Sequence, residues 1–289
     1  MENILEINNL CKNYEDFSLK DVSFSLPKGY IMGFVGQNGS GKTTTIRSIL
    51  NMAHKDSGKI SVFGLDSVDD SVKIKERLGV VFDSLYLADH LTPKQIEKQL
   101  KPFYENWDSK EYARLIKEFG LPENKKIGDY SKGMKMKFMI AAALSHKPEL
   151  MILDEPTSGL DPVARDELLD ILSEYIQDEN HGVLFSTHIT ADVERIADYV
   201  TILHNGKVWF TGNKDELAEK YMVVKGAEED IPVGVMEKMI GYHNYRNGFE
   251  ALICSEDAAG LPDELVCEKA SIDEILVYIA KEDKNERKS

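Results

Sequence analysis

A glycine-rich segment offers the first chemistry in this chain. Gly36-Gln37-Asn38-Gly39-Ser40-Gly41-Lys42-Thr43 fits the pattern G-x-x-x-x-G-K-[ST], between a predicted strand (residues 31–35) and a helix predicted from about Gly41. Its glycines let backbone N–H groups surround a phosphate, and the helix N-terminus adds partial positive charge. Lys42 can reach the β- and γ-phosphates, and the Thr43 hydroxyl can bind Mg²⁺. The segment predicts a nucleoside triphosphate site, because its flanking strand and helix disfavour an incidental glycine-rich turn.

Two adjacent acids form the second candidate group. Asp154 and Glu155 follow the apolar run Leu150-Met151-Ile152-Leu153, which is typical of a buried parallel strand. Ligands of open α/β sheets lie outside the carboxyl ends of the strands. We therefore expect Asp154 to hold Mg²⁺, directly or through water, and Glu155 to polarise the water that attacks the γ-phosphate. A solvated acidic loop is the alternative, and the phosphate-binding segment argues against it.

The remaining pattern supplies the elements that must position these groups. Alternating apolar residues predict strands at 4–7 and 19–26, helical periodicity covers residues 92–146, and a buried strand is expected at 182–186. A helix is expected from Pro162, and Asn205-Gly206 predicts a hairpin turn. After about Tyr221 the chain becomes acidic, with one amphipathic helix through Ile272 and Ile279.

Three further motifs complete an ordered set. Tyr130-Ser131-Lys132-Gly133-Met134 precedes the acid pair, Ser158-Gly159-Leu160-Asp161 follows it, and Ser186-Thr187-His188 ends the next predicted strand. Over residues 4–211 this order resembles the nucleotide-binding subunit of ABC (ATP-binding cassette) transporters: Walker A, signature, Walker B, D-loop and switch histidine. The resemblance implies an α/β P-loop NTPase fold with a mixed, largely parallel core sheet, an N-terminal antiparallel β subdomain and a helical signature subdomain. A small α+β appendage would follow. The expected boundaries are 1–220 for the cassette, with its helical subdomain at about 84–147, and 221–289 for the accessory region.

The resemblance also implies residue roles. ATP with Mg²⁺ would be hydrolysed to ADP and phosphate between two head-to-tail copies, or between this chain and a homologous cassette. Ser131, Lys132 and Gly133 would approach the γ-phosphate held by the partner, Asp161 would connect the two sites, and His188 would hydrogen-bond the γ-phosphate. Tyr14 aligns with the aromatic residue that stacks on adenine, although a surface tyrosine near a turn is the alternative. The full nucleotide-binding set adds Gly36, Gln37, Asn38, Gly39, Ser40, Gly41, Lys42, Thr43 and Thr44.

Two departures from the family pattern matter. Asp83 occupies the position of the usual Gln after the strand at 78–82; it can still bind Mg²⁺, but an ionised carboxylate donates no hydrogen bond. Communication with a membrane subunit through this position is therefore open. Lys132 and Met134 replace the usual glycine and glutamine of the signature. The basic run Lys132, Lys135 and Lys137 is either a solvated helix face or a source of positive potential near the phosphate, and we favour the solvated face for Lys135 and Lys137.

Composition limits the partners. The 289 residues carry a net charge of −15, which argues against binding to nucleic acid or directly to anionic lipid. No apolar run approaches the roughly 20 residues that span a bilayer, and no signal-peptide pattern opens the chain. We expect a cytoplasmic protein held at the inner face of the cell membrane by an integral membrane permease. The three scattered cysteines are expected to be free, buried thiols in a reducing compartment.

The leading hypothesis is an ATP-hydrolysing subunit that drives transport. The signature form and acidic extension resemble export-type ABC-2 cassettes of Gram-positive bacteria. The segment at about 84–107 would dock the permease through Leu85, Tyr86, Leu87 and Leu91, with local packing as the alternative. A soluble ABC ATPase in a non-transport assembly, such as cofactor biogenesis, is the alternative function. The cargo, the homodimeric or heterodimeric state and the role of the C-terminal region cannot be read from the sequence.

Overall fold

The computed structural model describes residues 2–83, 89–246 and 248–286. The chain divides into two compact units, Met1–Thr211 and Gly212–Ser289, which are described separately. The expected boundaries, 1–220 for the cassette and 221–289 for the accessory region, stay predictions.

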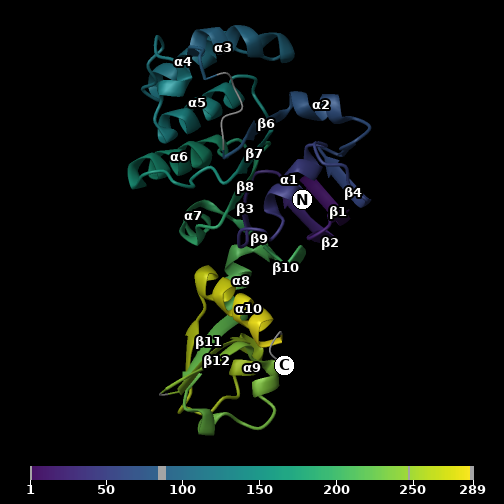
Figure 1. The fold of residues 1–289 in the computed structure, drawn as a ribbon, viewed down its shortest axis with the longest axis vertical. Coiled ribbons are helices and arrows are strands. Elements are labelled where there is room, and N and C mark those ends of the chain that lie inside the picture. Colours follow the sequence, from purple (N-terminus) through teal and green to yellow (C-terminus); the bar gives the residue numbers. More distant parts are fainter. Residues whose placement is uncertain (1, 84–88, 247, 287–289) are drawn as a thin grey trace. The chain divides into compact units, whose positions relative to one another are not determined.

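A six-stranded sheet forms the centre of the first unit, in the order β10-β9-β3-β8-β7-β6 (Figure 1). β3 pairs in parallel with β8 and β9, and β7 pairs in parallel with β6 and β8. Every residue of β3, β7 and β8 is buried, which explains why their sequences are nearly continuous apolar runs. The parallel arrangement brings the carboxyl ends of these strands to one edge. The strands are β3 (Ile31–Val35), β6 (Leu78–Val81), β7 (Leu150–Asp154), β8 (Gly182–Thr187), β9 (Tyr199–His204) and β10 (Lys207–Asn213).

A smaller antiparallel sheet, in the order β2-β1-β4-β5, precedes and flanks this core. Helix α1 (Lys42–Ile49) contributes Ile46 and Ile49 to the hydrophobic cluster that contains buried side chains of both sheets. This packing holds the start of α1 beside the end of β3. The flanking elements are β1 (Asn3–Asn13), β2 (Ser18–Pro27), β4 (Ser57–Val62), β5 (Leu65–Asp66) and α2 (Ser71–Glu76).

Helices α3 (Pro93–Leu100), α4 (Ser109–Glu118) and α5 (Lys132–Leu144) form a helical region between β6 and β7 (Figure 1). They enclose their own core, which includes Ile96, Tyr112, Leu115, Ile116 and Phe138. Two further helices, α6 (Pro162–Tyr175) and α7 (Thr190–Ile196), follow β7 and β8. The predicted α/β architecture, with its antiparallel and helical subdomains, is confirmed.

Three interpretations need correction or qualification. Lys137 is not solvated: its side chain is only 17% exposed, and its ammonium pairs with Glu167 at 2.5 Å. Leu91 packs against the helical core, as the local-packing alternative expected, whereas Leu85, Tyr86 and Leu87 lie outside the described residues. The cysteines are free as expected, but they are half-buried rather than buried.

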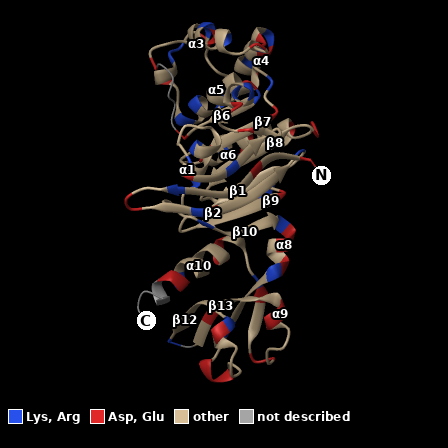
Figure 2. Ribbon diagram, turned by 90° about the vertical axis from the view of Figure 1, so that its right-hand side faces the viewer, with Lys and Arg blue, Asp and Glu red and all other residues tan. Residues whose placement is uncertain are grey.

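The second unit is a small α+β fold. Its antiparallel sheet has the order β12-β13-β11-β14 and encloses a separate core around Val224, Phe249 and Ile253. Acidic residues recur in α9, which carries red segments in Figure 2, and in the short helical turn at 228–230. None of the helices in the described residues is both long and apolar enough to cross a membrane. The elements are α8 (Lys214–Lys220), β11 (Tyr221–Gly226), β12 (Ile240–Tyr245), β13 (Gly248–Cys254), α9 (Ser255–Ala258), β14 (Val266–Lys269) and α10 (Ile272–Glu286).

Candidate nucleotide site

The phosphate-binding segment joins β3 to α1 as predicted. Gly39 and Gly41 have φ angles of 84° and 111°, a region that favours glycine. A Cβ at Gly41 would lie 2.5 Å from the Leu19 side chain and 2.7 Å from the Phe17 ring, so only glycine fits there. Helix α1 has no acidic residue in its first turn, which leaves its N-terminal amides and partial positive charge for an anion.

The acid pair lies at the carboxyl end of β7. Asp154 is only 4% exposed, and its Oδ1 accepts a hydrogen bond from the Ser186 hydroxyl at 2.6 Å. Glu155 has a φ of 52°, an unfavourable conformation for a residue with a Cβ, which typically costs about 1–3 kcal/mol. Its backbone N–H donates to the Ser186 carbonyl oxygen at 3.1 Å. The strained turn aims the Glu155 side chain away from the strand.

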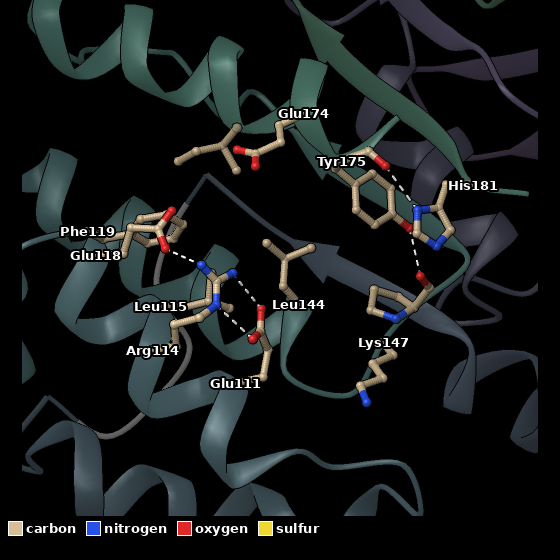
Figure 3. A pocket seen from close by; sticks show the side chains of 12 residues that line it. Glu111, Arg114, Leu115, Glu118, Phe119, Leu144, Lys147, Glu174, Tyr175 and His181 are labelled. Carbon is tan, nitrogen blue, oxygen red and sulfur yellow. Dashed lines mark hydrogen bonds and ion pairs between the residues drawn. The ribbon is translucent and has the colours of Figure 1, made fainter. Parts of the chain in front are cut away.

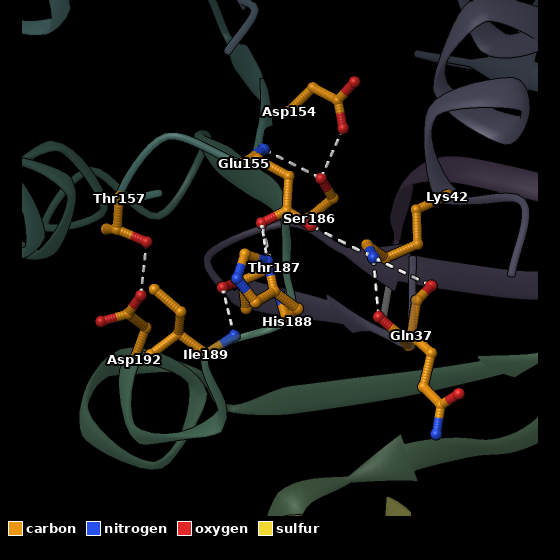
Figure 4. A network of polar contacts seen from close by, with 11 residues as sticks. Gln37, Lys42, Asp154, Glu155, Thr157, Ser186, Thr187, His188, Ile189 and Asp192 are labelled. Atoms are coloured by element: carbon orange, nitrogen blue, oxygen red, sulfur yellow. Dashed lines mark hydrogen bonds and ion pairs between the residues drawn. The ribbon is translucent and has the colours of Figure 1, made fainter. Parts of the chain in front are cut away.

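Three charged or titratable side chains meet beyond this turn (Figure 4). The Lys42 ammonium lies 3.1 Å from Glu155 Oε1 and also donates to the Gly36 carbonyl oxygen at 2.7 Å. His188 Nδ1 lies 2.7 Å from Glu155 Oε2. Lys42 is 6% exposed and Glu155 is 16% exposed, whereas His188 is 43% exposed. The structure thus gathers the predicted phosphate-binding lysine, general base and switch histidine around one carboxylate.

A cavity of about 520 Å³ opens beside Lys42 and Glu155. Most of its lining was predicted from the sequence, including Asp83, the residue at the departure from the family pattern. Asp16 and Phe17 were not predicted, although an aromatic residue in the same turn as Tyr14 was a usable signal. The lining residues are Asp16, Phe17, Gln37, Asn38, Gly39, Gly41, Lys42, Thr43, Thr44, Asp83 and Glu155.

Tyr14 lies at the edge of this region. Its ring is 49% exposed, and its backbone N–H donates to the Phe17 carbonyl oxygen at 2.8 Å. The Lys12 ammonium lies over the Tyr14 ring, 5.2 Å from its centre, whereas Phe17 lines the cavity itself. Adenine stacking by Tyr14 stays a prediction.

The signature and D-loop residues occupy different positions. Ser131 caps α5, where its hydroxyl accepts from the Met134 N–H at 3.2 Å, and Asp161 caps α6 by accepting from Val163 and Ala164. In the described part of the chain, Ser131, Lys132, Gly133 and Asp161 are absent from the cavity lining. A single chain therefore does not bring these predicted site residues to the phosphate-binding segment.

The oxygen donors suit Mg²⁺ bound together with a nucleotide. Thr43 and Asp83 line the same cavity, and both offer the hard oxygen ligands that Mg²⁺ prefers. Asp154 lies directly before Glu155 and is held by Ser186. Within residues 2–83, 89–246 and 248–286, no three His, Cys, Asp or Glu side chains gather to hold a metal by themselves. This arrangement fits an ion that keeps waters and shares its coordination with phosphates rather than a dedicated metal cage.

A second cavity, of about 270 Å³, lies at the opposite end of β7 and has a different character (Figure 3). Leu115, Phe119, Leu144 and Ile171 contribute apolar surface to it. The Arg114 guanidinium on its rim is already paired within the chain, because it contacts both Glu111 and Glu118. Among the described residues that line it, none is a glycine, in contrast to the first cavity.

Comparisons with known proteins agree with this geometry. The family described as "ABC transporter" matches residues 19–158. The "ABC transporter ATP-binding protein NatA" of Bacillus subtilis (strain 168) is 34% identical over 232 residues, which cover 77% of this chain and 91% of NatA. The "Bacitracin transport ATP-binding protein BcrA" of Bacillus licheniformis is 32% identical, over 85% of this chain and 82% of BcrA.

A solved structure described as "Structure of ATP binding subunit of ABC transporter" has a similar fold. It superposes with a TM-score of 0.68 at 33% sequence identity, over 74% of this chain and 91% of the other. The similarity therefore extends over nearly the whole of that subunit and over most of the curated relatives.

Proposed function

This chain belongs to the ATP-binding proteins of ABC transporters, and on that premise we propose that it hydrolyses ATP to ADP and phosphate to drive transport through a separate membrane permease. The observation that carries the proposal is the meeting of Lys42, Glu155 and His188 beside the glycine-rich cavity. These three groups correspond to phosphate binding, water activation and γ-phosphate recognition.

The Lys42–Glu155 contact gives the proposed reaction an order. A γ-phosphate that enters the cavity competes with Glu155 for the Lys42 ammonium, because the phosphate carries more negative charge. Lys42 then neutralises the phosphate, and the freed Glu155 carboxylate accepts a hydrogen bond from the attacking water. His188 Nδ1 lies 2.7 Å from Glu155 Oε2, and we assign to His188 a hydrogen bond to the same phosphate once it is bound.

The residues Thr43, Asp83 and Asp154 would hold Mg²⁺. The ion would neutralise charge on the phosphate oxygens as the terminal P–O bond breaks. Ser186 positions Asp154 for this task through the 2.6 Å hydrogen bond to its Oδ1.

The site is completed by a second copy or by a homologous cassette. Ser131 and Gly133 lie at the N-terminus of α5, where backbone N–H groups and a hydroxyl suit an anion, yet they do not line the cavity of their own chain in its described part. ATP bound by one chain and capped by Ser131 of another explains this separation. ATP would thereby promote pairing of the two chains.

The transport role rests on the relatives. BcrA is named a bacitracin transport ATP-binding protein, and NatA is named an ABC transporter ATP-binding protein. In line with the resemblance to export-type cassettes, we propose that this chain acts on the cytoplasmic face of the cell membrane, bound to a permease, with export as its direction.

Two measurements test the proposal. Glu155→Gln protein with Mg²⁺ and ATP is expected to double its mass in light scattering, whereas Glu155→Gln combined with Ser131→Arg, which places a bulky side chain at the α5 N-terminus, is expected to remain monomeric. Pairing of the chains in the absence of nucleotide, or no pairing in the presence of nucleotide, would contradict a site that is completed by a second chain. Affinity purification from detergent-solubilised cells is expected to recover an integral membrane protein. Recovery of soluble partners only would contradict the transport role.

A further inference from the structure

A buried carboxylate lies behind the proposed catalytic groups. Asp192, on α7, has no exposed surface. Its Oδ2 accepts a hydrogen bond from the Thr157 hydroxyl at 2.6 Å, and its Oδ1 accepts one from Arg165 Nε at 2.5 Å. Thr157 is only 1% exposed, and the Arg165 side chain is 29% exposed. Asp192 is not among the described residues that line the nucleotide cavity.

The two partners stand at opposite ends of one loop. Thr157 comes two residues after Glu155, and Arg165 comes four residues after Asp161, in the first turns of α6. The loop between them, residues 158–161, is the segment whose counterpart in the proposed dimer connects the two sites. One carboxylate therefore holds both ends of this loop.

The same carboxylate is tied to the switch histidine by the chain itself. Asp192 lies four residues after His188, and its N–H donates to the Ile189 carbonyl oxygen at 3.1 Å. Figure 4 shows the contact between Thr157 and Asp192 to the left of Glu155 and His188. A shift of residues 158–161 is therefore opposed by the hydrogen bonds to Asp192, four residues after His188.

We propose that Asp192 is a positioning residue. Its two side-chain hydrogen bonds, here called the staple, fix both ends of residues 158–161 and thereby hold Glu155, His188 and the loop in the geometry that hydrolysis and pairing require. This inference rests on the proposed function. Both bonds lie where water is largely excluded, so their loss leaves a buried acceptor unsatisfied and loosens the loop. ATP affinity depends on residues 36–44, on a separate element, and is preserved.

The chain provides a matched control on the same two helices. Arg195 on α7 pairs with Asp166 and Asp170 on α6, but these groups lie at the surface and do not touch the loop. Arg195→Gln therefore breaks an α6–α7 link without releasing the staple. If Asp192 merely packed α7 against α6, both changes would act alike.

The test uses Thr157→Val in the full chain, because Asp192→Ala leaves Arg165 without its partner and risks misfolding. Valine keeps the shape of threonine but removes the hydroxyl donor. We expect kcat to fall about tenfold, the typical effect of losing one hydrogen bond to a charged group, while KM for ATP stays within about twofold. Thr157→Ser, which keeps the hydroxyl, is expected to restore kcat.

Amide hydrogen exchange provides a readout that does not depend on turnover. The N–H of Ser158 donates to the Glu155 carbonyl oxygen, and the N–H of Leu160 donates to the Thr157 carbonyl oxygen, so both amides report on the loop. Their exchange is expected to be about tenfold faster in Thr157→Val and unchanged in Arg195→Gln.

The outcomes separate the two proposals. Unchanged exchange in Thr157→Val overturns the staple, whatever the activity; faster exchange with unchanged kcat overturns its role in positioning. A wild-type protein that binds ATP but never hydrolyses it would refute the proposed function. Exchange would then still decide whether Asp192 holds the loop.

Discussion

Strands β7 and β8 begin among aromatic rings and backbone carbonyls, whereas they end among acids, hydroxyls and an ammonium group. At the beginning, Tyr175 donates to the Pro148 carbonyl oxygen at 2.8 Å, and its ring stacks on His181 at 4.3 Å. At the end, Glu155 adopts a φ of 52° and faces Lys42 and His188. The two ends lie on the same strands.

The difference shows how one sheet serves stability and chemistry separately. At the starting edge, where the strands begin, polar groups are neutralised by fixed partners within the chain. The Arg77–Glu149 pair, with two contacts of 2.6 Å, is an example. Groups at the finishing edge are held by each other in a strained arrangement beside a cavity, so an incoming phosphate can rearrange them. We therefore expect changes at the finishing edge to alter turnover and binding, and changes at the starting edge to alter stability.

The largest contrast should come from two glutamates at the ends of β7. Glu155→Gln is expected to lower ATP turnover by at least about 100-fold, because a general base typically contributes that much, with little loss of stability. Phosphate release and thermal unfolding measure the two effects. Glu149→Gln, at the start of the same strand, is the control and should keep full turnover; comparable rates in all three proteins would refute the assigned base.

Two lysines, one before β3 and one at the start of α1 after it, sharpen the comparison further. Lys42→Met is expected to weaken ATP binding by roughly 10- to 100-fold, since it removes a charge-assisted contact in a largely buried site. Lys28→Met, which precedes β3 and only loses a surface pair with Glu2, should bind ATP like the wild type. Equilibrium titration with a fluorescent ATP analogue decides, and equal affinities in both variants would contradict the phosphate site.

His146 predicts a pH dependence of stability at the starting edge. Burial lowers the pKa of His146, which is 2% exposed, stacks on Tyr104 at 4.0 Å and contacts the Leu78 carbonyl oxygen at 2.9 Å. Below about pH 6.5 His146 takes up a proton in the unfolded chain more readily than in the folded chain. The free energy of unfolding therefore decreases as the pH is lowered, by up to about 1.4 kcal/mol per pH unit. His146→Gln should flatten this slope in denaturant unfolding between pH 7.5 and 5.5, whereas exposed His54→Gln should not.

The smallest effect concerns the Arg77–Glu149 pair. The hydrogen bond that Glu149 accepts from Arg77 lowers the pKa of Glu149 in the folded chain. The pair therefore stabilises the fold above the unfolded-state pKa of about 4.3, and this stabilisation is lost as the pH falls below that value. Both side chains are 35% exposed, and solvent screening limits the loss in Glu149→Gln to about 1 kcal/mol or less at pH 7. Unfolding curves of variant and wild type should converge near pH 3; a gap that persists there would contradict the ionic origin.

Much of the fold and site could be predicted because the relevant signals are local. The pattern from Gly36 to Thr43 specifies a strand, a glycine-rich turn and a helix within a few residues, and the apolar run before Asp154 requires burial on both faces. Lys137 was misjudged because its partner Glu167 is remote in sequence, on another helix. Phe17 was missed because the turn holds two aromatic residues, Tyr14 and Phe17, and the local sequence signals an aromatic residue without showing which ring lines the cavity.

The sequence alone determined which chemical groups this protein has and which secondary structure carries each, since periodicity, glycine positions and strand ends act over short distances. Only the tertiary structure decided how those groups meet: that Lys42 and His188 converge on one Glu155, that Asp192 holds both ends of residues 158–161, and that Ser131 lies outside the cavity of its own chain. These relations join segments far apart in sequence. They depend on the parallel pairing of β3, β7 and β8, which residue spacing does not encode.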